Sequence, residues 1–274
     1  MYNFCTLFDS NYLTRGLALY ESLEKHCKEF NLYIFAFDDK CYDILKGLNL
    51  EKAIIISLKE FENERLLEAK KTRSRGEYCW TCSSSSILYV LENFKVDNCI
   101  YVDADVYFFN APKILIEELP KDKSVIITEH RYPPHYAIME TNGKFCVQFV
   151  YFKNNDESKK VLKDWANKCI EWCYGRWEDN KFGDQKYLDE WPLKFNNIYI
   201  LKNEGGGLAP WNLYNYKLKE NENNFEIIRK KTKIKYPVVF YHFHDLRFYE
   251  NKTIQLTGGY FMVPSYYKKL YYIY

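Results

Sequence analysis

The fold of this chain is decided by the stretch Cys99-Ile-Tyr-Val-Asp-Ala-Asp-Val-Tyr-Phe-Phe109, an apolar run that Asp103 and Asp105 interrupt. Its first residues predict a buried strand, and the two aspartates follow where that strand ends. Side chains alternate along a strand with a period of two, so both carboxylates are expected on one side of the backbone. Two like charges there repel each other and resist desolvation. A divalent cation removes both problems, and carboxylate oxygens suit Mg²⁺ or Mn²⁺.

A solvated turn between two short strands is the alternative interpretation of this Asp-x-Asp sequence. The apolar residues before it and the aromatic residues after it favour the metal site. Such an ion can in turn hold a diphosphate.

The first half of the chain alternates strand and helix patterns. Strands are predicted at 2–8, 32–37, 53–57 and before Asp103, and helical patterns at 13–27, 43–48, 59–76 and 78–94. This β-α-β-α series builds a parallel sheet, in which ligands bind beyond the carboxyl ends of the strands. Asp9, Asp38 and Asp103 all follow such ends. The second half is less regular, with strands predicted at 124–128, 145–152, 195–201 and 238–244, and helices at 158–173 and 182–191, the latter ending at Pro192.

The length allows one large α/β domain or two small ones, and the absence of an internal repeat, linker or low-complexity block from the sequence favours one continuous domain. The chain has 274 residues and a net charge of +2 with mixed signs, which gives no electrostatic case for nucleic acid as a partner. No apolar stretch approaches a membrane span, and the first residues lack the basic region of a signal peptide. We therefore expect a cytoplasmic protein.

The nine cysteines are scattered through periodic segments, as expected of reduced, buried thiols. Two pairs, Cys79/Cys82 and Cys169/Cys173, have the spacing to be checked as a zinc or redox site. Neither pair lies in a Gly-rich knuckle and both fall in helical patterns, so plain packing is favoured.

Five short motifs in order resemble those of the GT-A nucleotide-sugar glycosyltransferases, most of all the family 8 type that includes bacterial lipopolysaccharide galactosyltransferases and glycogenin. The motifs are Phe8-Asp-Ser-Asn-Tyr12, Asp103-Ala-Asp105, Gly183-Asp-Gln185, Leu208-Ala-Pro-Trp-Asn212 and Tyr241-His-Phe-His-Asp245. The resemblance implies a GT-A fold: a single-domain, Rossmann-like α/β sheet with helices on both faces. It implies a glycosyltransferase domain over residues 1–250, with a nucleotide-binding half at 1–110, a donor-sugar and acceptor half at 111–250, and a tail at 251–274.

The resemblance also implies roles for single residues. Phe8, Asp9 and Asn11 would hold the nucleotide base and ribose, and Asp184 and Gln185 would face the donor sugar. Asp103, Ala104 and Asp105 would bind the metal and the nucleotide-sugar, and a histidine of the last motif would complete the metal shell. Arg247 is the nearest candidate for the family's phosphate-gripping lysine. The family's Phe-Asn-Ala/Ser-Gly strand stands here as Phe145-Cys-Val-Gln148, and 80–86 shows no counterpart of the family's helical arginine.

Read from the residues alone, His242 and His244 lie two apart on a predicted strand and should point the same way. Either could be a third ligand beside the aspartates, while a structural role is the usual one for a histidine. Position relative to the family motif favours His242.

The residues leave the stereochemistry of transfer open. Asp184 and Asp9 are the carboxylates available for a covalent intermediate, whereas Asp184, Glu204 and Asp245 are candidates for a general base. His130 and His135 fall where an acceptor loop would follow the metal strand, in a Pro-rich context that also fits a rigid surface loop. The Gly-Gly-Gly run at 205–207 suits close approach of backbone to a ligand or a plain loop equally.

The residues and this resemblance together predict a Mn²⁺- or Mg²⁺-dependent glycosyltransferase that acts on a surface-glycan or lipid-linked glycan acceptor. The resemblance alone implies that the donor is a UDP-hexose. The tail, with Lys268 and Lys269 among tyrosines, predicts a peripheral contact at the inner face of the membrane, or else a packed final helix. A sugar nucleotidyltransferase would also use an Asp pair and a metal, but it usually carries a Gly-rich basic loop after its first strand. A non-catalytic carbohydrate-binding or zinc-binding protein would leave the two aspartates without a purpose.

Overall fold

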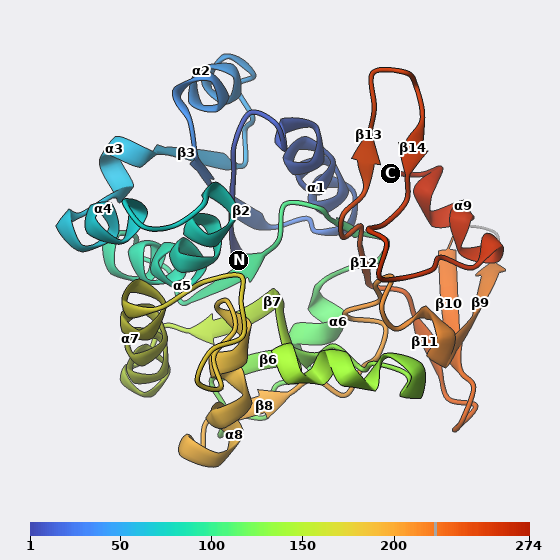
Figure 1. Ribbon diagram of the computed structural model, residues 1–274. Coiled ribbons are helices and arrows are strands. Elements are labelled where there is room, and N and C mark those ends of the chain that lie inside the picture. Colours follow the sequence, from blue (N-terminus) through green and yellow to red (C-terminus); the bar gives the residue numbers. More distant parts are fainter. Residues whose placement is uncertain (222–223) are drawn as a thin grey trace.

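A computed structural model describes residues 1–221 and 224–274 of the chain. Its first half alternates strands and helices as the sequence predicts (Figure 1). The elements are β1 (Tyr2–Phe8), α1 (Leu13–His26), β2 (Phe30–Ala36), α2 (Asp39–Gly47), β3 (Ala53–Ser57), α3 (Leu58–Phe61), α4 (Glu64–Lys70), α5 (Arg75–Asn93), β4 (Asn98–Val102), β5 (Val106–Phe108) and α6 (Lys113–Ile116).

The second half contains longer irregular connections and 3₁₀ turns. Its elements are β6 (Val125–Glu129), η1 (Pro134–Asn142), β7 (Phe145–Lys153), α7 (Asp156–Glu171), η2 (Gln185–Glu190), α8 (Trp191–Lys194), β8 (Ile198–Ile200), η3 (Leu213–Asn215), β9 (Tyr216–Asn221), β10 (Asn224–Arg229), β11 (Lys235–Pro237), β12 (Phe240–His242), β13 (Arg247–Phe248), β14 (Ile254–Gln255), η4 (Ser265–Tyr267) and α9 (Lys268–Tyr271).

A seven-stranded sheet in the order β3-β2-β1-β4-β7-β6-β8 forms the centre of the molecule. Strands β1 to β4 are parallel to their neighbours in this set, and β7 runs antiparallel to both β4 and β6. The parallel series therefore places the carboxyl ends of β1, β2 and β4 at one edge, where Asp9, Asp38 and Asp103 follow.

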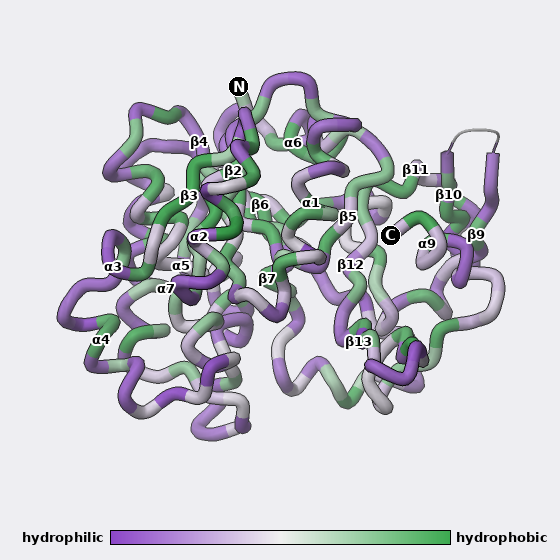
Figure 2. Tube along the Cα trace, turned by 90° about the horizontal axis from the view of Figure 1, so that it is seen from above, coloured by the Kyte–Doolittle hydropathy of each residue, from purple (hydrophilic) through white to green (hydrophobic). Residues whose placement is uncertain are grey.

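Alternation along β1 shows how helices cover both faces of this sheet. Cys5 and Leu7 face a core completed by α5 and α7, whereas Phe4 and Phe8 face a core completed by α1 and α2. Figure 2 shows the hydrophobic residues concentrated along the central strands, with hydrophilic residues on the outer turns. The predicted α/β sheet with helices on both faces is confirmed.

The predicted long helix at 59–76 is wrong. The segment forms α3 and α4 and then begins α5, because side chains at Ser57, Asn63 and Ser74 each cap a new helix by accepting a backbone N–H. The prediction that a helix ends at Pro192 is also wrong. This proline lies in the first turn of α8, where its missing N–H costs no hydrogen bond.

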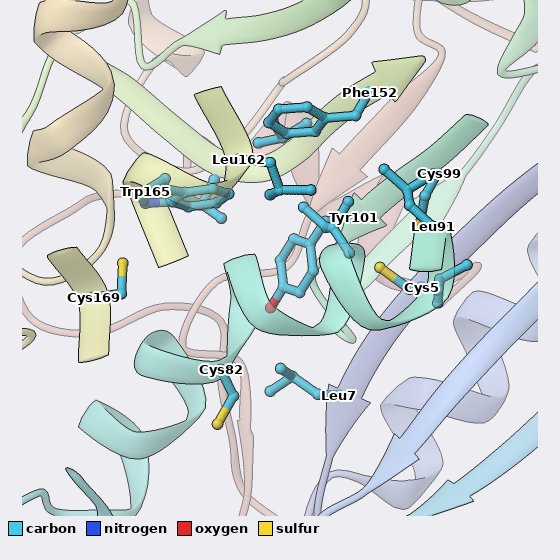
Figure 3. Close-up of a cluster of buried hydrophobic side chains, with 14 of the residues drawn as sticks. Cys5, Leu7, Cys82, Leu91, Cys99, Tyr101, Phe152, Leu162, Trp165 and Cys169 are labelled. Atoms are coloured by element: carbon cyan, nitrogen blue, oxygen red, sulfur yellow. The ribbon is translucent and has the colours of Figure 1, made fainter. Parts of the chain in front are cut away.

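The cysteines behave as packing residues. All nine are free thiols, and eight are buried. Figure 3 shows Cys82 and Cys169 in the core between α5, α7 and the sheet, among Leu7, Tyr101 and Trp165. Burial raises the pKa of Cys79 to about 12 and that of Cys82 well above its ordinary value, which keeps these thiols protonated and unreactive.

The tail packs on the second half of the chain through one of its faces. Tyr267 and Leu270 are fully buried in a cluster with Tyr241 and Phe243, and the Tyr271 and Tyr241 hydroxyls lie 2.9 Å apart. Its other face is open, with large exposed side chains at Tyr266, Tyr272 and Ile273. Within the described residues, no helix combines the length and apolar character needed to cross a bilayer.

Candidate metal and nucleotide-sugar site

Asp103, Asp105 and His242 converge at the carboxyl edge of the sheet. One ligand atom from each lies within 4.8 Å of the others, and no other such group of three acidic, thiol or imidazole side chains occurs in residues 1–221 and 224–274. His242 Nε2 lies 3.0 Å from Asp105 Oδ1 and 3.8 Å from Asp103 Oδ2. The histidine arrives from far along the chain because β12 pairs antiparallel with β5, which places His242 opposite Val106.

The spacing of the two aspartates predicted that both lie on one side of a strand, but neither of them is in a strand. They occupy a turn between β4 and β5, closed by a hydrogen bond from the Val106 N–H to the Asp103 carbonyl. The physical reason is that β5 leaves the main sheet to pair with β12, so the chain must turn at Ala104, which is buried. The turn brings both carboxylates to His242 all the same.

Electrostatics at this group reflect three ionisable side chains sharing a confined space. Burial raises the pKa of Asp103 to about 6, and the Asp105 carboxylate adds to this rise while His242 opposes it. Burial also favours neutral Asp105, but the facing His242 outweighs that effect and holds the pKa of Asp105 below its usual value. For His242, burial disfavours the cation, yet Asp105 raises its pKa well above the ordinary value. Positive charge is thus strongly favoured between the carboxylates.

This donor set fits a divalent cation. Two carboxylate oxygens and one imidazole nitrogen are hard to borderline ligands of the kind that hold Mn²⁺ or Mg²⁺. The ion would then supply the positive charge that protonated His242 provides in its absence. His244 stands apart from the group: β12 ends at His242, and the His244 side chain is exposed beside Trp211, whose ring centre is 5.4 Å away.

The predicted nucleotide residues lie at the end of β1. Asp9 accepts the Asn11 N–H at 2.8 Å, which shapes the turn after Phe8. The other Asp9 oxygen lies 2.5 Å from Arg75 Nε, and Arg75 also reaches Asp38 at 2.9 Å. Arg75 therefore ties the ends of β1 and β2 together from the first turn of α5. The sequence shows no arginine at 80–86, and Arg75 was not predicted as part of the site. The Ser74 capping signal could have shown that Arg75 begins a helix.

Asp184 is buried close enough to Asp103 for the two carboxyl groups to interact electrostatically. It accepts a hydrogen bond from the Ser83 hydroxyl at 2.6 Å, and its backbone carbonyl accepts from Trp165 Nε1 at 2.9 Å. Burial raises the pKa of Asp184 to about 7, against the Ser83 hydrogen bond and with help from the Asp103 charge. The neighbouring Gln185 is engaged elsewhere, because its amide donates to the Asn142 carbonyl at 2.9 Å.

Other residues considered in the sequence have protein partners. Arg247 is paired with Asp245 at 2.7 Å and is exposed, and Glu204 is paired with Arg229 at 3.1 Å. His130 is buried against Tyr132, and burial lowers its pKa to about 3.

His135 is exposed and its ring lies edge-on to that of Tyr214. The glycine run at 205–207 is buried against protein: a Cβ on Gly205 would lie 1.9 Å from the Pro237 carbonyl, so close packing of the chain itself requires it.

Comparison with known protein families identifies the family of this chain. A family model for nucleotide-diphospho-sugar transferases matches residues 30–192, more than half of the chain. The chain belongs to the nucleotide-diphospho-sugar transferase family. The matched segment includes β4 and the Asp103–Asp105 turn.

Relatives and solved structures extend the likeness of this transferase over most of its length. It is 28% identical to the uncharacterized protein YfnD of Bacillus subtilis (strain 168) over 263 residues, covering 94% of this chain and 82% of YfnD. The galactosyltransferase LgtC superposes with a TM-score of 0.54 at 13% identity, covering 88% of this chain and 86% of LgtC. For the glycosyltransferase GlyE of Streptococcus pneumoniae TIGR4 the TM-score is 0.49, and the chain spans 46% of GlyE. At 13% identity the LgtC structure shows the fold alone, and the predicted GT-A fold is thereby confirmed.

Proposed function

We propose that this transferase moves a hexose from a UDP-sugar to a surface-glycan or lipid-linked glycan acceptor and requires Mn²⁺ or Mg²⁺. The observation that carries the proposal is the convergence of Asp103, Asp105 and His242 at the sheet edge where nucleotides bind in such folds. The family membership supports a nucleotide-sugar donor, and the choice of UDP and a hexose comes from the resemblance to family 8.

Asp103, Asp105 and His242 would hold the ion, and His244 is the alternative histidine. When bound, the metal supplies positive charge that neutralises the diphosphate leaving group. Because Asp103 and Asp105 follow the end of β4, beside β1 in the sheet, an ion held by them would lie at that edge.

The nucleotide would lie over the turn after β1. Asp9 and Asn11 would meet the base and ribose, with Phe8 beneath them. Arg247 would approach the diphosphate only after leaving Asp245, with which it is paired at 2.7 Å. The Asp9–Asn11 hydrogen bond already holds the turn that would meet the nucleotide.

Asp184 and Gln185 would act on the sugar side. A buried carboxyl whose pKa lies at about 7 can exchange a proton near neutral pH, which suits a group that accepts a proton from an acceptor hydroxyl. Gln185 would need to release its bond to the Asn142 carbonyl to meet the donor sugar.

The exposed face of the tail supports the proposal that this cytoplasmic protein makes a peripheral contact with the inner face of the membrane. Tyr266, Tyr272 and Ile273 are exposed beside Lys268, a combination that suits an anionic headgroup layer. Lys269 would have to leave its ion pair with Glu220 to join them. An acceptor carried on a lipid would then be presented at the same surface.

A donor screen tests the proposal. The protein is incubated with Mn²⁺ and a panel of nucleotide-sugars headed by UDP-galactose, the choice that the LgtC likeness favours, and released nucleoside diphosphate is measured with and without a crude glycan acceptor. Release of UDP from one donor, dependent on the metal, supports the proposal. Release of inorganic pyrophosphate from a nucleoside triphosphate and a sugar phosphate would instead identify a nucleotidyltransferase, and no turnover of any donor would favour a binding protein.

A further inference from the structure

His242 is held from both sides of its ring. Nε2 faces the carboxylates, and Nδ1 lies 2.9 Å from the Oε1 atom of Gln148. Gln148 is fully buried on β7, the antiparallel neighbour of β4 in the sheet. Cys146, two residues earlier on the same strand, faces the same ring, as strand alternation requires.

The ring's protonation pattern gives the contact with Gln148 a chemical consequence. An imidazole that binds an ion through Nε2 needs a lone pair there, so the neutral ring must carry its hydrogen on Nδ1. The side-chain oxygen of Gln148, Oε1, accepts that hydrogen. Without an acceptor at this place the ring is free to carry the hydrogen on Nε2 instead, where it would donate to Asp105 and exclude a cation.

The backbone of Gln148 acts on a second ligand. Its carbonyl oxygen accepts the N–H of Asp103 at 3.3 Å, at the point where β4 passes into the aspartate turn. One residue of β7 therefore contacts the side chain of His242 and the backbone of Asp103.

The remaining amide nitrogen of Gln148 argues against a purely packing role. It is buried, and it has no hydrogen-bond partner in the part of the chain that the structure describes. It faces Gly207, where a Cβ would come within 2.9 Å of it. A buried donor without an acceptor destabilises a fold, so an apolar side chain of this size would pack here at lower cost.

We propose that Gln148 is the positioning residue of this metal centre: its side-chain oxygen fixes His242 in the tautomer that leaves Nε2 free for the cation. The inference rests on the metal site of the proposed function. Partners of this kind, which orient a metal-binding histidine, change metal affinity by about 10- to 100-fold when removed.

Binding of Mn²⁺ alone to the full chain tests the proposal, with free Mn²⁺ measured by electron paramagnetic resonance. Gln148→Met keeps the size of the side chain without its acceptor, and Gln148→Asn keeps the amide but shortens its reach. We expect both to weaken Mn²⁺ binding by about 10- to 100-fold. Gln148→Glu retains an acceptor oxygen and should bind Mn²⁺ at least as tightly as Gln148→Met and Gln148→Asn do. Thermal unfolding in chelator should show that every variant is folded at the temperature of the binding measurement.

Thr128→Val is the matched control. Thr128 lies on β6 and is as buried as Gln148. Its hydroxyl donates to the Cys146 carbonyl on β7, so this side-chain hydrogen bond does not involve His242. Its Mn²⁺ affinity should equal that of the wild type. Unchanged Mn²⁺ affinity in Gln148→Met and Gln148→Asn would overturn the role of Gln148 while leaving the metal site in place. A wild-type chain that binds no Mn²⁺ would remove the metal site itself, and with it this inference.

Discussion

Replacing Asp184 by Asn should make the protein more stable above neutral pH. Asp184 is buried, and its pKa is raised by burial from 3.8 to about 7. Below about pH 4 the carboxyl is protonated in both the folded and the unfolded chain, so it costs nothing. As the pH rises toward 7 the unfolded chain releases this proton first, and the folded state loses stability. Above about pH 7 the full cost applies.

The magnitude follows from the two pKa values. Because each pKa unit corresponds to about 1.4 kcal/mol, the difference between 3.8 and about 7 corresponds to a cost of about 4 kcal/mol. Asn cannot ionise, and its side-chain oxygen can still accept the Ser83 hydrogen bond. Asp184→Asn should therefore raise the free energy of unfolding by up to about 4 kcal/mol near pH 8 and by only about 1 kcal/mol near pH 4.5.

Urea unfolding at the two pH values, in chelator so that no bound cation alters the pKa of Asp184, measures this difference. Asp122→Asn, at an exposed carboxyl, is the control and should change stability by less than about 0.5 kcal/mol at both pH values. The same Asp184→Asn protein should lose transfer activity if Asp184 handles a proton. A variant that is no more stable than the wild type near pH 8, or equally stabilised at both pH values, would refute the reasoning.

Three further predictions concern the metal, the nucleotide and the tail. His242→Ala should weaken Mn²⁺ binding far more than His244→Ala, and the reverse order would assign the ligand to His244. Asp9→Ala should weaken binding of free UDP measured by calorimetry, whereas unchanged UDP affinity with reduced turnover would place Asp9 in the chemistry. Changing the exposed Tyr272 and Ile273 to Ser should reduce sedimentation with anionic vesicles while leaving the buried face of the tail intact, and equal sedimentation would show that the tail is no anchor.

Local patterns in the sequence predicted the sheet well because each strand carries its own signal. β1 was predicted with its observed bounds, and the aspartates after β1, β2 and β4 meet at one edge because parallel strands end together. The GT-A fold and the family resemblance are confirmed. The residue roles and the division at residue 110 and at residue 250 stay predictions.

Contacts between distant segments account for what the sequence did not reveal. The aspartate turn depends on pairing between β5 and β12, which are far apart in the chain. Arg75 reaches Asp9 only because the first turn of α5 lies beside the residues that follow β1 and β2. Gln148 stood in the sequence as a departure from a family motif, and only the position of His242 gives it a partner. Such pairings carry no periodic signal, so pattern and propensity cannot show them.

The central claim is that Asp103 and Asp105 bind a cation on which sugar transfer depends. The most direct measurement compares UDP release from the best UDP-sugar donor by the wild type, Asp103→Asn and Asp105→Asn, each with Mn²⁺ and with chelator, alongside circular dichroism of the metal-free proteins. The account predicts metal-dependent release by the wild type, none by either variant, and folded spectra for all three. Undiminished release in chelator, or variants that turn over donor like the wild type, would contradict it.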